Sequence, residues 1–182
     1  MLKPKNNFKV VTDKKTARVI LPNMLTLIGV CIGLTSIRFA LDGRFEFAIV
    51  AIILAAIIDG LDGRIARLIK GTSKVGKELD SLTDMISFGV APAFIMYFWK
   101  LNTLGRFGWL VCLIYVICVA LRLARFNVNS SQEPSWRDNF FEGVPSPAGG
   151  ILVLTPLIFS MTNFEFIPIN YDIVAPIFFI AT

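Results

Sequence analysis

Long apolar runs separated by short polar segments dominate the sequence. The runs cover approximately residues 20–40, 45–58, 85–99, 107–124 and 149–161, with a last run from 173 to 182. Several are shorter than the ~20 residues that a helix needs to cross a bilayer. The second and third runs reach that length only if their helices continue into the polar segment between them. The pattern therefore predicts an all-α fold, a polytopic bundle of about six transmembrane helices.

The composition also indicates a membrane protein. Of the 182 residues, 55% are hydrophobic and 17% are charged, and the mean hydropathy is +0.68. We expect a basic cytoplasmic segment at residues 1–19, either a solvated tail or a helix on the membrane surface, and one transmembrane domain at residues 20–182. As a helix, the last run would extend only about 15 Å, so we expect a truncated sixth span.

The basic residues predict the orientation, because positive charges concentrate on the cytoplasmic side of membrane proteins. With the N-terminus inside and the spans alternating, fourteen of the 18 lysines and arginines fall on the inner side. The four on the outer side are Arg38, Arg44, Lys100 and Arg106. We therefore expect an integral protein of the inner (cytoplasmic) membrane. The polar segment between its second and third runs should face the cytoplasm.

Four aspartates stand at regular intervals in that polar segment: Asp59, Asp62, Asp80 and Asp84, here called the aspartate quartet. The first two are spaced i,i+3 and the last two i,i+4, so each pair lies on one face of a helix. Carboxylates are costly at membrane depth and need a partner that neutralises them. Two facing helices would direct all four to one point, which predicts a site for two divalent cations.

The chain has no histidine, the commonest general base and transition-metal ligand. Any metal site must then use oxygen ligands, which favour hard cations such as Mg²⁺, Mn²⁺ or Ca²⁺. Paired cations suit displacement at phosphorus, because they stabilise both the attacking and the leaving oxygen. Gly60 and Gly63 leave room for a phosphate-bearing ligand, and Arg67 can offer its guanidinium to phosphate oxygens. A solvated charged loop is the alternative, but it does not explain the regular intervals.

The pattern Asp-x2-Asp-Gly-x2-Ala-Arg-x8-Gly-x3-Asp-x3-Asp, from Asp59 to Asp84, resembles the signature of the CDP-alcohol phosphatidyltransferase family. All eight signature residues are present at the family's spacing. Residues 22–26, Pro-Asn-Met-Leu-Thr, resemble the family's Pro-Asn-x-Leu-Thr element on the first helix, although Pro-Asn can also start a helix. The resemblance implies a membrane enzyme that moves a phosphatidyl group from CDP-diacylglycerol to an alcohol and releases CMP. Members are commonly homodimers.

The resemblance also implies roles for individual residues. The aspartate quartet would hold two Mg²⁺ or Mn²⁺ ions, and Asp84 would be the general base for the acceptor hydroxyl. The residues expected to contact CDP-diacylglycerol are Asn23, Thr26, Asp62, Gly63, Arg67 and Gly76. The implied partners are this lipid, the acceptor alcohol and membrane lipid, with no nucleic acid.

Two further segments resemble the serine-accepting branch of the family: residues 120–127, Ala-Leu-Arg-Leu-Ala-Arg-Phe-Asn, and residues 141–150, Phe-Glu-Gly-Val-Pro-Ser-Pro-Ala-Gly-Gly. The first places Arg122 and Arg125 at the cytoplasmic end of a span, where they could meet the carboxylate of L-serine or a lipid phosphate. Ordinary anchoring by positive charge is the alternative. The second would start the next helix with small residues that allow close packing.

Other interpretations stay open at this point. The same fold and chemistry could serve glycerol 3-phosphate or an inositol phosphate as acceptor, although these would need a denser basic pocket. A divalent-cation channel or transporter would use the aspartates as permeation sites, but all four lie near one membrane face. A non-catalytic assembly partner would bind metal without turnover. We expect the phosphatidyl transferase with L-serine as acceptor.

Overall fold

The computed structural model describes residues 14–68, 74–129, 144–162 and 170–181. Within these ranges the chain is helical and contains no strand, so the predicted all-α fold is confirmed. The elements are α1 (Lys14–Leu41), α2 (Phe45–Leu68), α3 (Lys74–Asp84), the π-helix η1 (Met85–Val90), α4 (Ala91–Trp99), the 3₁₀-helix η2 (Leu101–Leu104), α5 (Arg106–Asn129), α6 (Ser146–Val153), α7 (Thr155–Met161) and α8 (Tyr171–Ala181).

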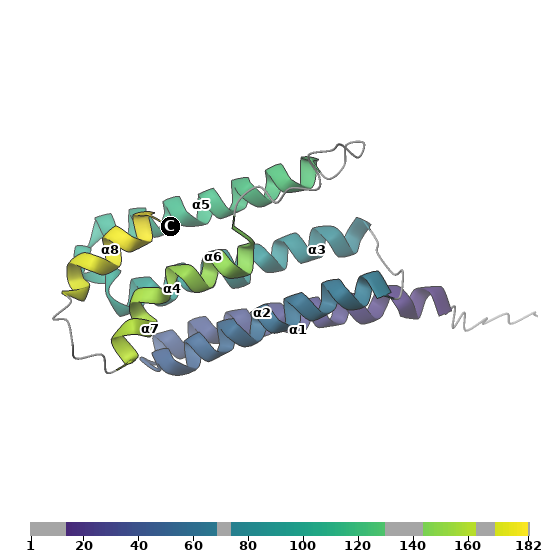
Figure 1. Ribbon diagram of the computed structural model, residues 1–182, viewed down its shortest axis with the longest axis horizontal. Coiled ribbons are helices and arrows are strands. Elements are labelled where there is room, and N and C mark those ends of the chain that lie inside the picture. Colours follow the sequence, from purple (N-terminus) through teal and green to yellow (C-terminus); the bar gives the residue numbers. More distant parts are fainter. Residues whose placement is uncertain (1–13, 69–73, 130–143, 163–169, 182) are drawn as a thin grey trace, which may run out of the picture.

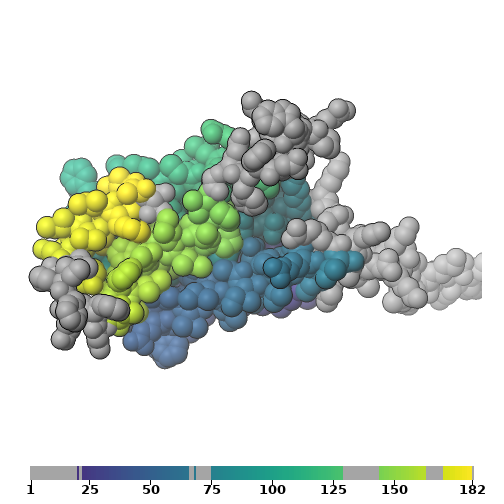
Figure 2. All heavy atoms as spheres, viewed as in Figure 1, coloured from purple at the N-terminus to yellow at the C-terminus, as the bar shows by residue number. Residues whose placement is uncertain are grey.

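The long helices form an elongated bundle (Figure 1). Helix α1 packs along α2, and the two are joined by a tight turn in which Gly43 has a φ of 73°, a left-handed conformation that glycine adopts readily. Elements α3, η1 and α4 follow one another as a single rod, here called the third rod, and α5 returns beside it. On the face shown in Figure 2, α6 and α7 lie between α8 and α2.

The π-helix η1 lies where α1, α5 and α6 approach the third rod most closely. A Cβ atom added to Gly33 of α1 would stand 2.5 Å from the Ser87 Oγ. A Cβ on Gly150 of α6 would stand 3.1 Å from the Cα of Phe88. Single π-helical turns are rare in proteins, and those that occur are often found at functional sites. Here the turn begins directly after the last residue of the aspartate quartet.

Three described helical segments are long and apolar enough to cross a membrane: Pro22–Leu41, Val75–Trp99 and Arg106–Val128. Helix α2 is of similar length, but its second half carries two of the aspartates. Large apolar side chains cover the outside of the bundle; Phe107 and Leu121 on α5, for example, are 76% and 62% exposed. Such a surface suits contact with lipid. The predicted helical membrane bundle is confirmed.

Aromatic residues gather at the end of the bundle opposite the aspartate quartet. The rings of Trp99 and Tyr171 lie 5.9 Å apart, and the Arg44 guanidinium lies 4.3 Å from the centre of the Phe47 ring. Tryptophan and tyrosine concentrate at membrane–water interfaces, because their rings are apolar and their tips polar. This end therefore has the composition of a membrane interface.

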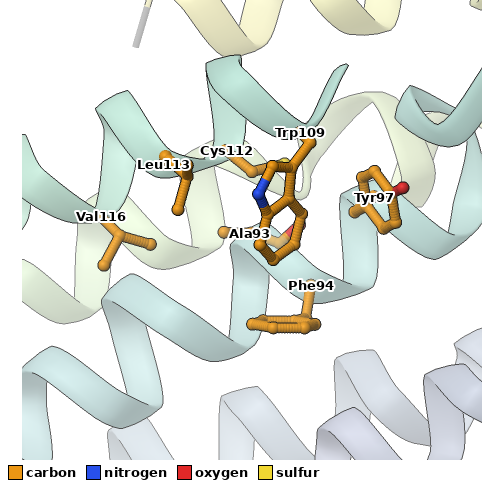
Figure 3. Close-up of a pocket in the computed structure, with 7 residues that line it drawn as sticks. All are labelled: Ala93, Phe94, Tyr97, Trp109, Cys112, Leu113 and Val116. Atoms are coloured by element: carbon orange, nitrogen blue, oxygen red, sulfur yellow. The ribbon is translucent and has the colours of Figure 1, made fainter. Parts of the chain in front are cut away.

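Helices α4 and α5 enclose a small cavity of about 20 Å³ at the same end (Figure 3). Phe94 and Tyr97 surround the Trp109 indole in edge-to-face contacts. The Cys112 thiol faces the carbonyl oxygen of Ala93 at 3.5 Å. The lining is almost entirely apolar, so this cavity is a feature of the helix packing and offers no chemistry.

The structure corrects two details of the sequence analysis. The run at 149–161 is broken at Leu154, because the ring of Pro156 and its missing N–H interrupt the helix. Pro22 lies inside α1 and does not start it.

Candidate metal and substrate site

The second half of α2 and the helix α3 bring three carboxylates of the aspartate quartet together. Asp59, Asp62 and Asp80 each place one carboxylate oxygen within 4.8 Å of the others. The spacing i,i+3 puts the first two on one face of α2, and that face is turned toward α3. The Asp62 side chain is buried, whereas Asp59 stays partly exposed. Three oxygen ligands thus surround a point that can be reached from outside.

Asp84, the last member of the quartet, lies deeper in the bundle at the end of α3. Its carboxyl group is hydrogen-bonded to the carboxyl group of Asp59 and to the side chain of Ser146 from α6. Its Oδ1 atom is buried and has no hydrogen-bond partner among the described residues. Two carboxyl groups in contact need a proton or a cation between them, and a buried oxygen without a partner is costly.

A hard divalent cation fits this arrangement. The donors are carboxylate oxygens from two neighbouring helices, which is the ligand type that Mg²⁺ and Mn²⁺ prefer. A bound cation would neutralise the repulsion between the acids and satisfy the buried oxygen of Asp84. These carboxylates are thus suited to hold divalent metal.

The expected lipid-contacting residues surround the same end of α2. Asn23 is half-buried on α1, one turn from Thr26, whose hydroxyl donates to the Oδ2 of Asp62 at 2.8 Å. A Cβ on Gly63 would meet no atom within 4 Å, so the space beside this residue is open. Gly76 lies in the first turn of α3. The side chain of Arg67 lies outside the described part of the chain.

Two hydrogen-bonded contacts fix how α5 lies against the third rod. Near one end, the Asn127 amide donates to the hydroxyl of Ser81 at 2.9 Å. Further along, the Tyr115 hydroxyl donates to the Phe88 carbonyl at 3.0 Å. Because the two rods are antiparallel, residues between Ser81 and Phe88 lie level with residues between Tyr115 and Asn127.

This register places Arg122 level with Asp84 and on the inner side of α5. Arg122 is half-buried and interacts electrostatically with the Tyr115 hydroxyl inside the bundle, whereas Arg125 is exposed. The structure thus separates the two arginines that the sequence offered together. Of the two arginines, only Arg122 is half-buried.

Sequence reasoning missed Ser146. The segment Pro145-Ser146-Pro147 was assigned a packing role, but α6 begins at Ser146 and presents its side chain to Asp84. The sequence signal for this contact was the single hydroxyl among the small and apolar residues at 144–150. Residues 141–143 of the same segment lie outside the described ranges, as does most of the basic segment at 1–19.

A groove of about 210 Å³ between α3 and α5 lies on another face of α3. Its polar end contains Glu78, Ser81 and Asn127, and its apolar end contains Leu82, Met85 and Leu123. These residues point away from the aspartates, because Asp80 and Asp84 face α2. The groove is therefore separate from the metal site.

Comparison with known proteins agrees with this geometry. A sequence profile of the CDP-alcohol phosphatidyltransferase family matches residues 19–180. The match covers most of the chain and includes the whole aspartate quartet. The chain belongs to the CDP-alcohol phosphatidyltransferase family.

Curated relatives carry a more specific name. The chain is 48% identical over 137 residues to the CDP-diacylglycerol–serine O-phosphatidyltransferase of Mycobacterium leprae, covering 74% of this chain and 45% of the relative. It is 42% identical over 135 residues to the Helicobacter pylori protein of the same name, covering 74% and 56%. The Bacillus subtilis protein of that name is 36% identical over 134 residues, covering 74% and 73%. The chain spans about half the length of the first two.

Proposed function

We propose that this chain is an integral membrane, metal-dependent transferase that moves the phosphatidyl group of CDP-diacylglycerol to L-serine. The observation that carries the proposal is the convergence of carboxylates from α2 and α3 on one point. Membership of the family and the printed names of the relatives support the same activity. The products are phosphatidylserine and CMP.

The aspartate quartet would hold two divalent cations, Mg²⁺ or Mn²⁺. When bound, they neutralise the pyrophosphate of the lipid and the charge that develops on the departing CMP. The protein contributes the fixed orientation of the carboxylates, which two packed helices provide at little reorganisation cost during the reaction.

The nucleotide part of CDP-diacylglycerol would lie over the open side of α2. Gly63 leaves space there for the pyrophosphate, and Arg67 follows on the next turn with a guanidinium suited to phosphate oxygens. Asn23 on α1 and Gly76 on α3 would complete the nucleotide site, with Thr26 buried beneath it against Asp62. The acyl chains would extend sideways into the bilayer along the apolar outer surface of the bundle.

Asp84 would act as the general base. The serine hydroxyl oxygen attacks the lipid-side phosphorus and forms a new P–O bond, while the hydroxyl proton passes to the Asp84 carboxylate. The bond between that phosphorus and the oxygen of CMP breaks, and CMP leaves with the bonding electron pair. Holding the two reactants in line removes most of the entropic cost of their encounter.

Arg122 would bind the serine carboxylate. It is level with Asp84 and half-buried, so it can hold the amino acid with the hydroxyl directed toward the base. Arg125 is exposed and would instead contribute to positive charge near lipid phosphates.

We further propose that the end of the bundle with the quartet faces the cytoplasm, and that the protein works as a homodimer in the inner membrane. Arg64 lies in the half of α2 that carries Asp59 and Asp62, and Lys77 lies in α3. Arg122 and Arg125 lie near the end of α5 that contacts Ser81. The aromatic residues lie at the opposite end. Counted along the whole sequence, fourteen basic residues against four support this orientation.

One assay tests the activity and the acceptor together. The purified protein is incubated with CDP-diacylglycerol, Mn²⁺ and one alcohol at a time, and the lipid product is identified by mass spectrometry. We expect phosphatidylserine and CMP with L-serine only. A lipid product with glycerol 3-phosphate or an inositol phosphate, and none with serine, would contradict the assignment of L-serine as the acceptor. Metal flux in proteoliposomes without any lipid product would favour the transporter.

A further inference from the structure

We infer that Thr26 is a positioning residue of the metal site, whose hydroxyl holds the Asp62 carboxylate in the orientation that binds the cation. The inference rests on the proposed function and deepens it. It assigns Thr26 a role through another residue, where the family resemblance implied contact with CDP-diacylglycerol.

The contact between the two side chains is short and enclosed. The Thr26 hydroxyl donates to the Oδ2 of Asp62 at 2.8 Å, and the side chains belong to different helices, α1 and α2. Thr26 is 5% exposed and Asp62 is 3% exposed. A hydrogen bond to a carboxylate is stronger than one between neutral groups, and it is stronger still where water is excluded.

Both ends of this contact are held in place. The Thr26 hydroxyl also lies 3.0 Å from the Pro22 carbonyl of its own helix, and a β-branched side chain has few rotamers in a helix. The backbone N–H of Gly63 also donates to the Asp62 carboxyl. Asp62 is therefore oriented before any cation binds, with one oxygen within 4.8 Å of those of Asp59 and Asp80.

The burial of Thr26 favours this indirect role over direct contact with the nucleotide. A side chain with 5% of its surface exposed, and with its hydroxyl within hydrogen-bond distance of both Asp62 and the Pro22 carbonyl, has little left to offer a substrate. Groups that hydrogen-bond to metal ligands fix their orientation, and their loss typically weakens metal binding about 10- to 100-fold.

The test measures Mn²⁺ binding to the purified full chain in detergent, without any lipid substrate. Free Mn²⁺ is followed by electron paramagnetic resonance for the wild type, Thr26→Val and Thr26→Ser. We expect Thr26→Val, which keeps the shape and removes the hydroxyl, to raise the Kd for Mn²⁺ about 10- to 100-fold. Thr26→Ser, which keeps the hydroxyl, should stay within about threefold of the wild type.

A matched control is Thr83→Val on α3. Thr83 is also buried, but its hydroxyl donates to the Leu79 carbonyl of its own helix and to no aspartate. This variant should bind Mn²⁺ like the wild type. Circular dichroism and thermal unfolding check that each variant folds. If Thr26→Val does not fold, Thr26→Ala serves in its place, because a smaller side chain creates no overlap.

The outcomes separate the inference from the proposed function. Wild-type affinity for Mn²⁺ in the folded Thr26→Val variant, with a raised KM for CDP-diacylglycerol, would overturn the inference and restore direct contact with the substrate. A wild-type protein that makes phosphatidylserine yet binds no Mn²⁺ would overturn the metal site itself, and the positioning role with it.

Discussion

The side chain of Ser146, in the first turn of α6, reaches the carboxyl group of Asp84 at the end of α3. One helical turn further along both rods, Gly150 lies against Phe88, where an added Cβ would stand 3.1 Å from the Phe88 Cα. The close approach at this glycine sets the position of α6 along the third rod. It therefore also sets where Ser146 meets the proposed base.

Gly150→Ala should destabilise the bundle and disturb the site. The new methyl group would lie 3.1–3.2 Å from backbone and Cβ atoms of Phe88, which cannot turn away as the end of a flexible side chain can. Overpacking of this kind costs about 1–3 kcal/mol. Thermal unfolding in detergent should show a lower Tm. The neighbouring Gly149→Ala is the control, because its Cβ would meet nothing within 4 Å. Equal Tm values for both variants would contradict the packing argument.

Ser146→Ala should lower kcat and leave the KM for CDP-diacylglycerol unchanged. A hydrogen bond to a charged group contributes about 1.5–3 kcal/mol, so its loss should slow turnover roughly 10- to 100-fold. Steady-state kinetics with varied lipid concentration measure both constants. Ser160→Ala is the control, since that hydroxyl donates only to the Leu157 carbonyl of its own helix. A wild-type kcat for Ser146→Ala would show that Ser146 has no part in catalysis.

Asp84→Asn should abolish turnover while much of the nucleotide binding remains. The amide has nearly the same shape but cannot accept the proton of the serine hydroxyl, and the loss of a general base typically costs about 10²- to 10⁴-fold. CMP release measures turnover, and calorimetry with CDP-diacylglycerol in micelles measures binding. Asp42→Asn is the control, because this residue pairs with Arg38 at the opposite end of the bundle. Near-normal CMP release by Asp84→Asn would show that another group is the base.

Arg122→Ala and Arg125→Ala should behave differently. Removing the half-buried Arg122 should raise the KM for serine at least tenfold, because a carboxylate bound by a partly buried guanidinium loses a charge-assisted hydrogen bond. Removing the exposed Arg125 should change the KM for serine little. Initial rates at varied serine concentration give the KM of each variant. An equal effect of both substitutions on the KM for serine would indicate that both arginines only anchor the helix by their positive charge.

Divalent metal should stabilise the folded protein and support its activity. A cation that binds only the folded state adds about 2.7 kcal/mol at 100 times its Kd. Adding Mn²⁺ to chelator-treated protein should therefore raise Tm and restore CMP release. In Asp62→Asn, which weakens the site, the rise in Tm should be much smaller. An unchanged Tm in the wild type would argue against cations between these helices.

The sequence was sufficient to predict the fold class and the helical positions of the aspartates. Apolar runs set the helices, and their lengths required α2 and α3 to continue through the polar segment, as they do. The intervals of the quartet also predicted which acids share a helix face, since that depends only on the helical repeat. The eight-residue pattern was specific enough to predict the family that the profile comparison then showed.

Contacts between distant segments could not be predicted in this way. The sequence offers Arg122 and Arg125 as equivalents, and only the packing of α5 on the third rod distinguishes them. It likewise gives no reason to connect Ser146 with Asp84, because that contact depends on a glycine one turn away that lets two backbones approach.

The sequence by itself determined the helices, their apolar surfaces and the set of oxygen ligands, because these follow from local periodicity and side-chain chemistry. Tertiary structure alone decided which side chains meet those ligands. The Thr26 hydroxyl reaches Asp62 only because α1 packs against α2, and close helix contacts of this kind depend on the shape of both surfaces at once.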